Sequence, residues 1–144
     1  MNEYQSRLKR GNEMAKKLGR ASRMLPLKKL YPPIYDLTIG HVFGDIWTRP
    51  HLDLRERELI TLAANIALGR QVGIKGHYKS ALHIGITKDE IMELIIHVGH
   101  YSGWPTIAHA AMQYNEMLEE DAAAKKNKKP VRSRVPAAGR ANRR

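Results

Sequence analysis

Two helix-start signals, each followed by an apolar stripe of helical spacing, constrain the fold of this chain more than any other feature. In each signal a hydrogen-bond acceptor is followed three positions later by a glutamate, as in a capping box: Asp53 with Glu56, and Thr87 with Glu90. The apolar residues behind them recur three and four positions apart: Leu59, Leu62, Ala63 and Ile66, then Ile91, Leu94, Ile95 and Val98. Each stripe lies on one face of a helix, so both segments are predicted to pack into an apolar core.

The rest of the chain also has the pattern of helices. No segment alternates apolar and polar side chains as a half-buried strand does, and no hairpin signal occurs. Gly69 and Gly85 stand where helices commonly end, and Tyr31-Pro32-Pro33 is predicted to be a turn. We therefore predict an all-α fold. The expected helices are residues 4–18, 34–47, 54–68, 72–84, the segment between Thr87 and the SGWP interruption at 102–105, and residues 106–120.

The positive charge of the chain is concentrated at its two ends. The net charge is +11, with seven basic and two acidic residues in 1–25, nine and eleven in 26–120, and nine and one in 121–144. From this we predict a basic, partly helical N-terminal extension, a helical domain over 26–120, and a basic, disordered tail. The tails could attract nucleic acid, but the second has no aromatic side chain for base stacking. Solvated tails are therefore the favoured interpretation.

The residue types that are absent exclude several kinds of chemistry. The chain has no cysteine, so it has no disulfide, no thiolate metal site and no thiol redox step. No apolar run approaches the roughly 18 residues that a membrane span needs, and no apolar signal core lies near the N-terminus. We therefore expect a soluble, cytoplasmic protein without membrane contact.

The segment ALGRQVGIKGH, residues 67–77, joins two predicted helices and ends on a histidine. It is not a phosphate-binding P-loop, because Tyr78 stands where the second glycine belongs and the preceding element is a helix. Glu58 before this joint and His77 after it would meet if the two helices are antiparallel. A carboxylate on one imidazole nitrogen would then fix the tautomer of the other. Helical periodicity alone favours the simpler interpretation that Glu58 is a solvated acid paired with a neighbouring arginine.

Two further segments combine aromatic and polar side chains at helix ends. GDIWTRP holds Trp47, which would line a pocket, and Arg49, whose guanidinium matches a carboxylate bidentately. HVGHYSGWP holds two histidines three positions apart, together with Tyr101 and Trp104. That histidine spacing permits two zinc ligands, but no third ligand is evident, so no metal is expected. Each of these side chains also suits an ordinary core or surface role.

The same segments resemble the carboxymuconolactone decarboxylase family. The resemblance rests on GDIWTRPHLDLRERELITLAANIALGR and GHYKSALHIGITKDEIMELIIHVGHYSGWPTIAHA, and it covers about residues 30–118. It implies a single alkylhydroperoxidase D-like helical domain that assembles into a ring, commonly a trimer or hexamer. It also implies a cofactor-independent carbon–carbon lyase, a decarboxylase of 4-carboxymuconolactone in aromatic-compound catabolism.

The resemblance also indicates which branch of the family is relevant. The thiol-peroxidase branch carries a glutamate, a CxxC pair, and a histidine four residues beyond the second cysteine. In this sequence the glutamate and histidine positions are Glu58 and His77, but the cysteine positions hold Arg70 and Gly73. The resemblance therefore points to the branch without the cysteine pair, to which the decarboxylase belongs.

The resemblance and the residue types together give a candidate site. Glu58 would orient His77, and His77 or His100 would supply an oxyanion contact or the proton. The candidate substrate-binding residues are Arg49 and Arg70 as carboxylate clamps, Tyr101 as an assisting group, and Trp47 and Trp104 as pocket walls. No metal or cofactor is expected, and the expected partners are a small carboxylate substrate and copies of the chain. The alternatives are a relative that acts on a different carbonyl acid, and a non-enzymatic oligomer that binds anionic partners through its tails.

Overall fold

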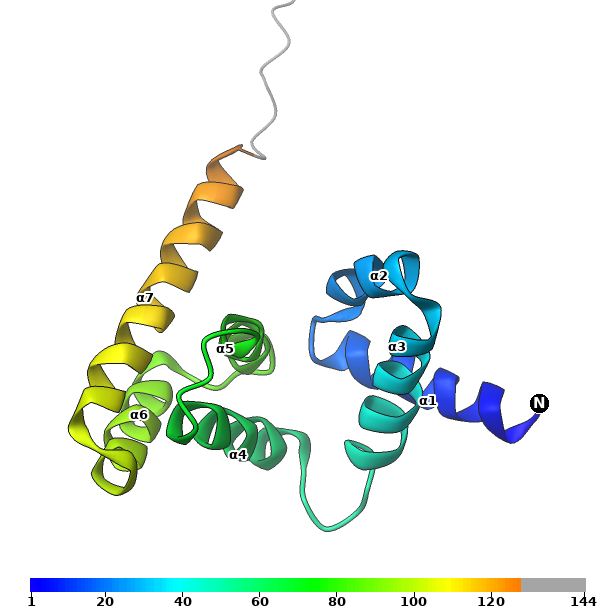
Figure 1. The fold of residues 1–144 in the computed structure, drawn as a ribbon, viewed down its shortest axis with the longest axis horizontal. Helices are drawn as coiled ribbons and strands as arrows, with labels where there is room; N and C mark the ends of the chain where they lie inside the picture. Colours follow the sequence, from blue (N-terminus) through cyan, green and yellow to red (C-terminus); the bar gives the residue numbers. More distant parts are fainter. Residues whose placement is uncertain (128–144) are drawn as a thin grey trace, which may run out of the picture.

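The computed structural model describes residues 1–127, and every regular element in this part of the chain is a helix (Figure 1). The elements are α1 (Glu3–Lys17), α2 (Ala21–Leu30), α3 (Pro32–Asp36), the π-helix η1 (Leu37–Ile46), α4 (Leu54–Ala67), α5 (Ile74–His83), α6 (Lys88–Ser102) and α7 (Trp104–Asn127). The all-α prediction is confirmed for these residues. None of their helices has both the length and the apolar character that crossing a membrane requires. The expected tail begins inside α7, and its residues 128–144 lie outside the described part.

Both predicted capping boxes are present. The Asp53 side chain accepts a hydrogen bond from the Glu56 amide at 2.7 Å, and the Glu56 carboxylate accepts one from the Asp53 amide at 2.7 Å. Thr87 and Glu90 form the same reciprocal pair at the start of α6. Gly69, just past the end of α4, has a φ of +62°, a left-handed conformation that glycine adopts without strain. Local hydrogen bonding therefore sets the limits of α4 and the start of α6.

Parts of the chain differ from the sequence prediction. Residues 21–30 form α2, although Pro26 lies inside it. The two prolines after Tyr31 open α3 instead of forming a turn, because their fixed φ suits the first positions of a helix. The predicted helix break over SGWP is only one residue long in the structure. Gly103, with a φ of +100°, separates α6 from α7. The expected domain boundary between residues 25 and 26 falls within α2.

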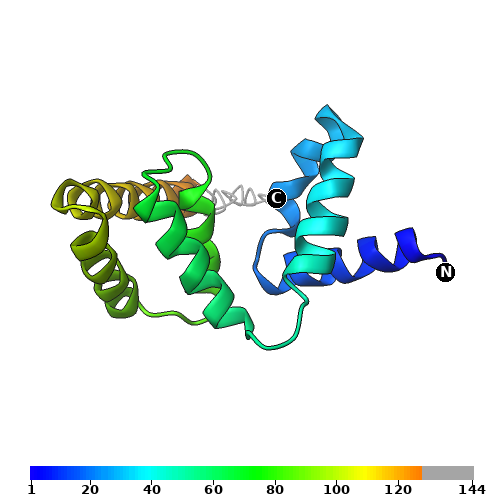
Figure 2. The same cartoon turned by 60° about the horizontal axis from the view of Figure 1, so that its bottom comes forward.

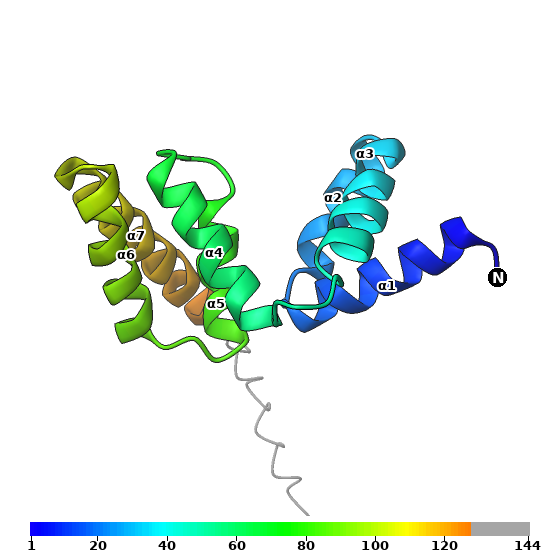
Figure 3. The same cartoon turned by 90° about the horizontal axis from the view of Figure 1, so that it is seen from below.

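The helices form two groups, each around its own apolar core (Figures 2 and 3). The core of the N-terminal group, α1 to η1, consists of Ala15, Leu18, Tyr35, Ile39, Phe43 and Trp47. The core of the C-terminal group, α4 to α7, includes Leu62, Ile74, Tyr78, Ile91, Ile95 and Met117. The loop between η1 and α4 joins the groups, and α2 and α5 face each other across the junction (Figure 1). This junction is where a site built from both groups can form.

Within the N-terminal group, α1 packs so closely on η1 that two glycines leave no room for a side chain. A Cβ atom on Gly11 would lie 1.7 Å from the Ile39 carbonyl oxygen, and one on Gly44 would lie 2.5 Å from the Arg7 carbonyl oxygen. Helix α1 therefore shares the N-terminal core, although the sequence prediction treats its residues as an extension. This packing holds η1 in place, and side chains of η1 line the cavity described below.

Replacing Gly11 by alanine is expected to lower the free energy of unfolding by about 2–3 kcal/mol, because the new methyl group would collide with the backbone of η1. Gly40→Ala is the matched control. A Cβ there meets only the Leu8 Cδ2 atom at 3.6 Å, so we expect unchanged or slightly higher stability. Urea unfolding followed by circular dichroism measures both. Equal stability of the two variants would contradict the close α1–η1 contact.

Candidate active site

A buried carboxylate and a histidine meet at the junction of the two helix groups. Glu58 on α4 has no exposed surface, and the side chain of His77 on α5 is 17% exposed. The joint after α4 returns the chain beside that helix, which places Glu58 Oε1 2.8 Å from His77 Nδ1. Glu58 is therefore not a solvated acid, and its neighbour Arg55 forms an ion pair with Glu90 instead.

The partners of His77 define the role of each ring nitrogen. A carboxylate only accepts hydrogen bonds, so Nδ1 carries a proton and donates it to Glu58. Nη1 of Arg20 lies 3.0 Å from Nδ1 and 3.2 Å from Nε2. Because a guanidinium only donates and Nδ1 is engaged by Glu58, Nε2 is the ring nitrogen that can accept from Arg20. Glu58 thus occupies Nδ1 and leaves Nε2 as the ring nitrogen that faces Arg20 and the cavity.

Arg20 is a largely enclosed cation beside this pair. Its guanidinium carbon lies 5.8 Å from the centroid of the Phe43 ring, in cation–π geometry. Arg20 Nε and Glu58 Oε2 are buried, and neither has a hydrogen-bond partner within residues 1–127. Burial lowers the pKa of Arg20, and the negative charge of Glu58 opposes that shift. Arginine keeps its proton under such conditions, so the site holds a positive charge next to His77.

A cavity of about 320 Å³ opens beside His77. The helices α2, η1, α4 and α5 supply most of its walls: Arg20, Met24, Leu27, Thr38, Val42, Phe43, Trp47, Thr61 and His77. The Trp47 indole stacks on the His77 ring, with centroids 6.3 Å apart and planes inclined by 21°. This volume is at the lower end of the range for small-molecule sites, about 300–1,000 Å³. One cationic wall, two hydroxyl groups and otherwise apolar sides suit a small organic anion.

The remaining sequence candidates do not line this cavity. Arg49 and Arg70 are exposed, near the two ends of α4. His100, Tyr101 and Trp104 are exposed at the α6–α7 junction, where the rings of His100 and Trp104 meet edge to face at 6.4 Å. The structure therefore brings together Glu58, His77 and Trp47 but not these five. Their roles stay predictions.

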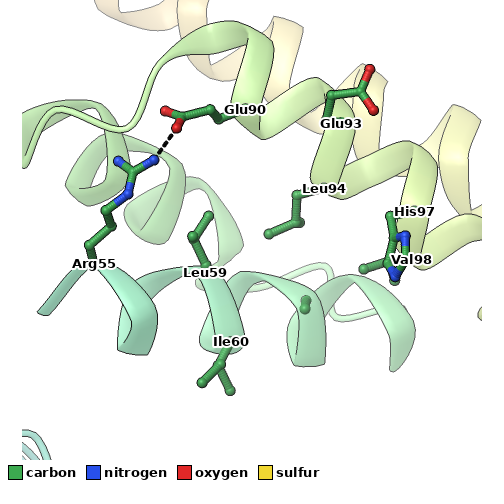
Figure 4. A pocket seen from close by; sticks show the side chains of 9 residues that line it. Arg55, Leu59, Ile60, Glu90, Glu93, Leu94, His97 and Val98 are labelled. Atoms are coloured by element: carbon green, nitrogen blue, oxygen red, sulfur yellow. Dashed lines mark hydrogen bonds and ion pairs between the residues drawn. The ribbon is translucent and has the colours of Figure 1, made fainter. Parts of the chain in front are cut away.

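A larger cavity, about 530 Å³, lies between α4 and α6 (Figure 4). Leu59 and Leu94 point into it, and its walls are mostly apolar. Arg55 and Glu90 pair with each other at one end, and His97 lies at the other. No cluster of three potential metal-ligating side chains occurs within residues 1–127. Since this cavity has no buried acid–histidine pair, the smaller cavity beside His77 is the better candidate for chemistry.

Sequence reasoning missed Arg20 and Phe43 as members of the site. Arg20 lies in a basic stretch that was expected to be an extension, and Phe43 lies in a π-helix that was expected to be an α-helix. The one local signal for Arg20 was Gly19, which ends α1 at a φ of +64° and turns the chain.

Residues 32–116 match the model of the Carboxymuconolactone decarboxylase family. The matched part contains Glu58, His77 and Trp47, and it begins after Arg20. The family match therefore includes the acid–histidine pair but not the cation beside it.

Three similar proteins differ in how much of the chain they cover. The 4-carboxymuconolactone decarboxylase of Acinetobacter baylyi is 39% identical over 79 residues, which is 55% of this chain and 58% of that protein. The nitrosuccinic acid decarboxylase npaB of Metarhizium robertsii is 28% identical over 88 residues, 61% of this chain and 62% of that protein. An uncharacterized 15.0 kDa protein of Paracoccus denitrificans is 30% identical over 112 residues, 74% of this chain and 84% of that protein. The chain thus spans less than two thirds of either decarboxylase.

Proposed function

The chain belongs to the carboxymuconolactone decarboxylase family, as its sequence predicts, and we propose that it is a cofactor-independent carboxy-lyase. Its proposed substrate is a small lactone or related keto acid of the 4-carboxymuconolactone kind. The observation that carries this proposal is the buried Glu58–His77 pair beside a cavity with a cationic wall. The two similar proteins named as decarboxylases support the reaction class.

In the proposed reaction the substrate itself accepts the electrons. The departing carboxylate of 4-carboxymuconolactone sits on a saturated ring carbon next to the ring double bond, and that double bond is conjugated to the lactone carbonyl. When the carbon–carbon bond breaks, its electron pair moves through that double bond to the carbonyl oxygen and gives a dienolate. The nitro group of nitrosuccinic acid can accept an electron pair in a similar way. The protein then has to stabilise the oxyanion and protonate a carbon.

His77 is the proposed proton donor. Nε2 takes up a proton from solvent and passes it to the ring carbon, so each turnover consumes one proton and releases one CO2. Glu58 is a positioning residue, because it holds Nδ1 and its charge stabilises the imidazolium that forms. The stacked Trp47 indole restricts the tilt of the imidazole ring.

The five sequence-predicted site residues that do not line the cavity stay proposals, and they depend on contacts between subunits. Arg49 and Arg70 as clamps, and His100, Tyr101 and Trp104 as further site residues, would require contacts that residues 1–127 of one chain do not make. Tyr101 and Trp104 are 83% and 70% exposed, and large exposed aromatic side chains are typical of subunit contacts. The proposed trimer or hexamer would bury such surfaces.

The proposed function is tested by incubating the full chain with 4-carboxymuconolactone, and separately with nitrosuccinic acid and related keto acids. We expect CO2 release equal to the acid consumed, without an added cofactor, for at least one member of this panel. Heat-denatured protein provides the background rate. Absence of CO2 release from every acid would refute the decarboxylase proposal.

A further inference from the structure

We propose that Arg20 binds the carboxylate that stays on the product, and that it thereby makes the site selective for dicarboxylic acids. The inference rests on the proposed decarboxylase function and names the residue that would recognise the substrate. Arg20 precedes residues 32–116, the part that matches the family. The N-terminal helices of this chain, and not the matched region, would therefore supply this recognition.

Arg20 has binding capacity that the described chain does not use. No carboxylate within residues 1–127 lies at ion-pair distance from it, and its close polar contacts are with the His77 ring. Its Nε is buried without a partner. A largely buried cation is costly unless an anion pairs with it. A ligand carboxylate would supply that anion, and a guanidinium can offer it two parallel N–H groups.

The neighbouring Arg23 is engaged elsewhere. Its guanidinium donates to the carbonyl oxygens of Gly19 and Gly76, at 3.1 and 3.3 Å, and approaches Ser80 Oγ at 3.4 Å. It does not line the cavity. Arg23 therefore ties α2 to α5 and adds positive charge, while Arg20 presents its guanidinium at the cavity wall.

The course of decarboxylation determines which substrate carboxylate belongs on Arg20. The departing carboxylate loses its negative charge as the bond breaks, so a cation on it would stabilise the ground state more than the transition state. The retained carboxylate keeps its charge, so holding it positions the substrate without raising the barrier. The apolar side chains Met24, Leu27 and Val42 line the same cavity and suit the departing group, which becomes neutral CO2.

The same contact would release His77 for its role. Nη1 of Arg20 lies 3.2 Å from Nε2, the atom proposed to carry the proton. A carboxylate that accepts the Nη1 hydrogen bond leaves the Nε2 lone pair free to take up that proton. Substrate recognition and proton delivery would therefore be coupled through one guanidinium group.

The test uses two unreactive probes of similar shape that differ by one charge. Glutaramate has one carboxylate and its diamide, glutaramide, has none; titration calorimetry on the full chain at fixed ionic strength gives the Kd of each. We expect the unmodified chain to bind glutaramate about tenfold or more tightly than glutaramide, as a charge-assisted contact predicts. Arg20→Gln should reduce this ratio to about threefold or less, whereas Arg23→Gln, the matched loss of charge, should keep it near tenfold.

Several results would overturn the assignment of Arg20. They are equal affinity of the two probes for the unmodified chain, no binding of glutaramate at millimolar concentration, an unchanged ratio in Arg20→Gln, or an equal fall in Arg23→Gln. If Arg20→Gln does not fold, Arg20→Lys takes its place, because it keeps the charge but loses the two-pronged geometry. The ratio of the two Kd values for Arg20→Lys must then be lower than the ratio for the unmodified chain.

The probes separate this inference from the proposed function. Neither probe is decarboxylated, so the ratio of their Kd values can be measured whether or not any acid releases CO2. The expected ratio without CO2 release would refute the proposed decarboxylase function and leave the role of Arg20 in binding intact. On an acid that is turned over, Arg20→Gln should raise KM about tenfold and change kcat less than about threefold. A loss confined to kcat would instead assign Arg20 to positioning His77 and would contradict the proposal.

Discussion

Replacing His77 by glutamine is expected to lower kcat for decarboxylation by about 100- to 10,000-fold, the contribution typical of general acid–base catalysis. Glutamine can still donate a hydrogen bond to Glu58 Oε1, which lies 2.8 Å from His77 Nδ1, but it cannot take up and return a proton. The cavity walls stay in place, so KM should change by less than about threefold. CO2 release at saturating substrate measures the loss, and circular dichroism checks the fold.

Two other histidines make this prediction specific. His83 lies on the same helix, is exposed and does not line the cavity, so His83→Gln should keep the original kcat. His100→Gln tests the other proton donor that the sequence suggested. A large loss in His100→Gln and none in a folded His77→Gln would move the proton-donating role from α5 to α6.

Helix limits were the most predictable part of the fold, because local hydrogen bonds set them. The capping boxes start α4 and α6 at the predicted positions, and α4 ends at Ala67, one residue before the predicted end. Helix α2 could not be found in this way. None of its ten residues is buried, so no apolar stripe marks it, and Pro26 argues against a helix.

The π-helix shows a different limit of sequence reasoning. Residues 34–47 have the apolar spacing of an α-helix, yet residues 37–46 form η1, and the Trp47 amide bonds to the Val42 carbonyl five residues back. This helix packs closely against α1, where a Cβ on Gly11 or Gly44 would meet the backbone of the other helix. Such packing between distant segments leaves no periodic signal in the sequence.

The candidate site was predictable where a family resemblance or a marked residue type, such as Trp47, pointed to its members. The family resemblance gave the positions of Glu58 and His77, and a short joint between two helices brings them together. Arg20 is 57 residues from His77, and their contact crosses the junction of the helix groups. No local sequence pattern therefore predicts this contact. Arg49 and Arg70 have the right chemistry for a clamp, but residue type does not reveal which way a side chain points.

Replacing Glu58 by glutamine is expected to lower kcat by about 10- to 100-fold, which corresponds to the roughly 1.5–3 kcal/mol of a hydrogen bond to a charged group. Glutamine can still accept from His77 Nδ1, but it has no charge to stabilise the imidazolium. A neutral amide is easier to bury than a carboxylate, so thermal stability should change little. Glu56→Gln, on the same helix and exposed, keeps the capping box and should keep the original kcat.

The double variant determines whether Glu58 acts through His77. If it does, removing His77 leaves the Glu58 charge without a function, and Glu58→Gln in the His77→Gln background should lower kcat by less than about threefold. Independent effects would multiply instead, giving a further loss of 10-fold or more. Glu58 has no exposed surface and does not line the cavity, and its hydrogen bond is to the imidazole. Multiplying losses would therefore refute its role as a positioning residue for His77 and would assign its effect to its charge beside Arg20.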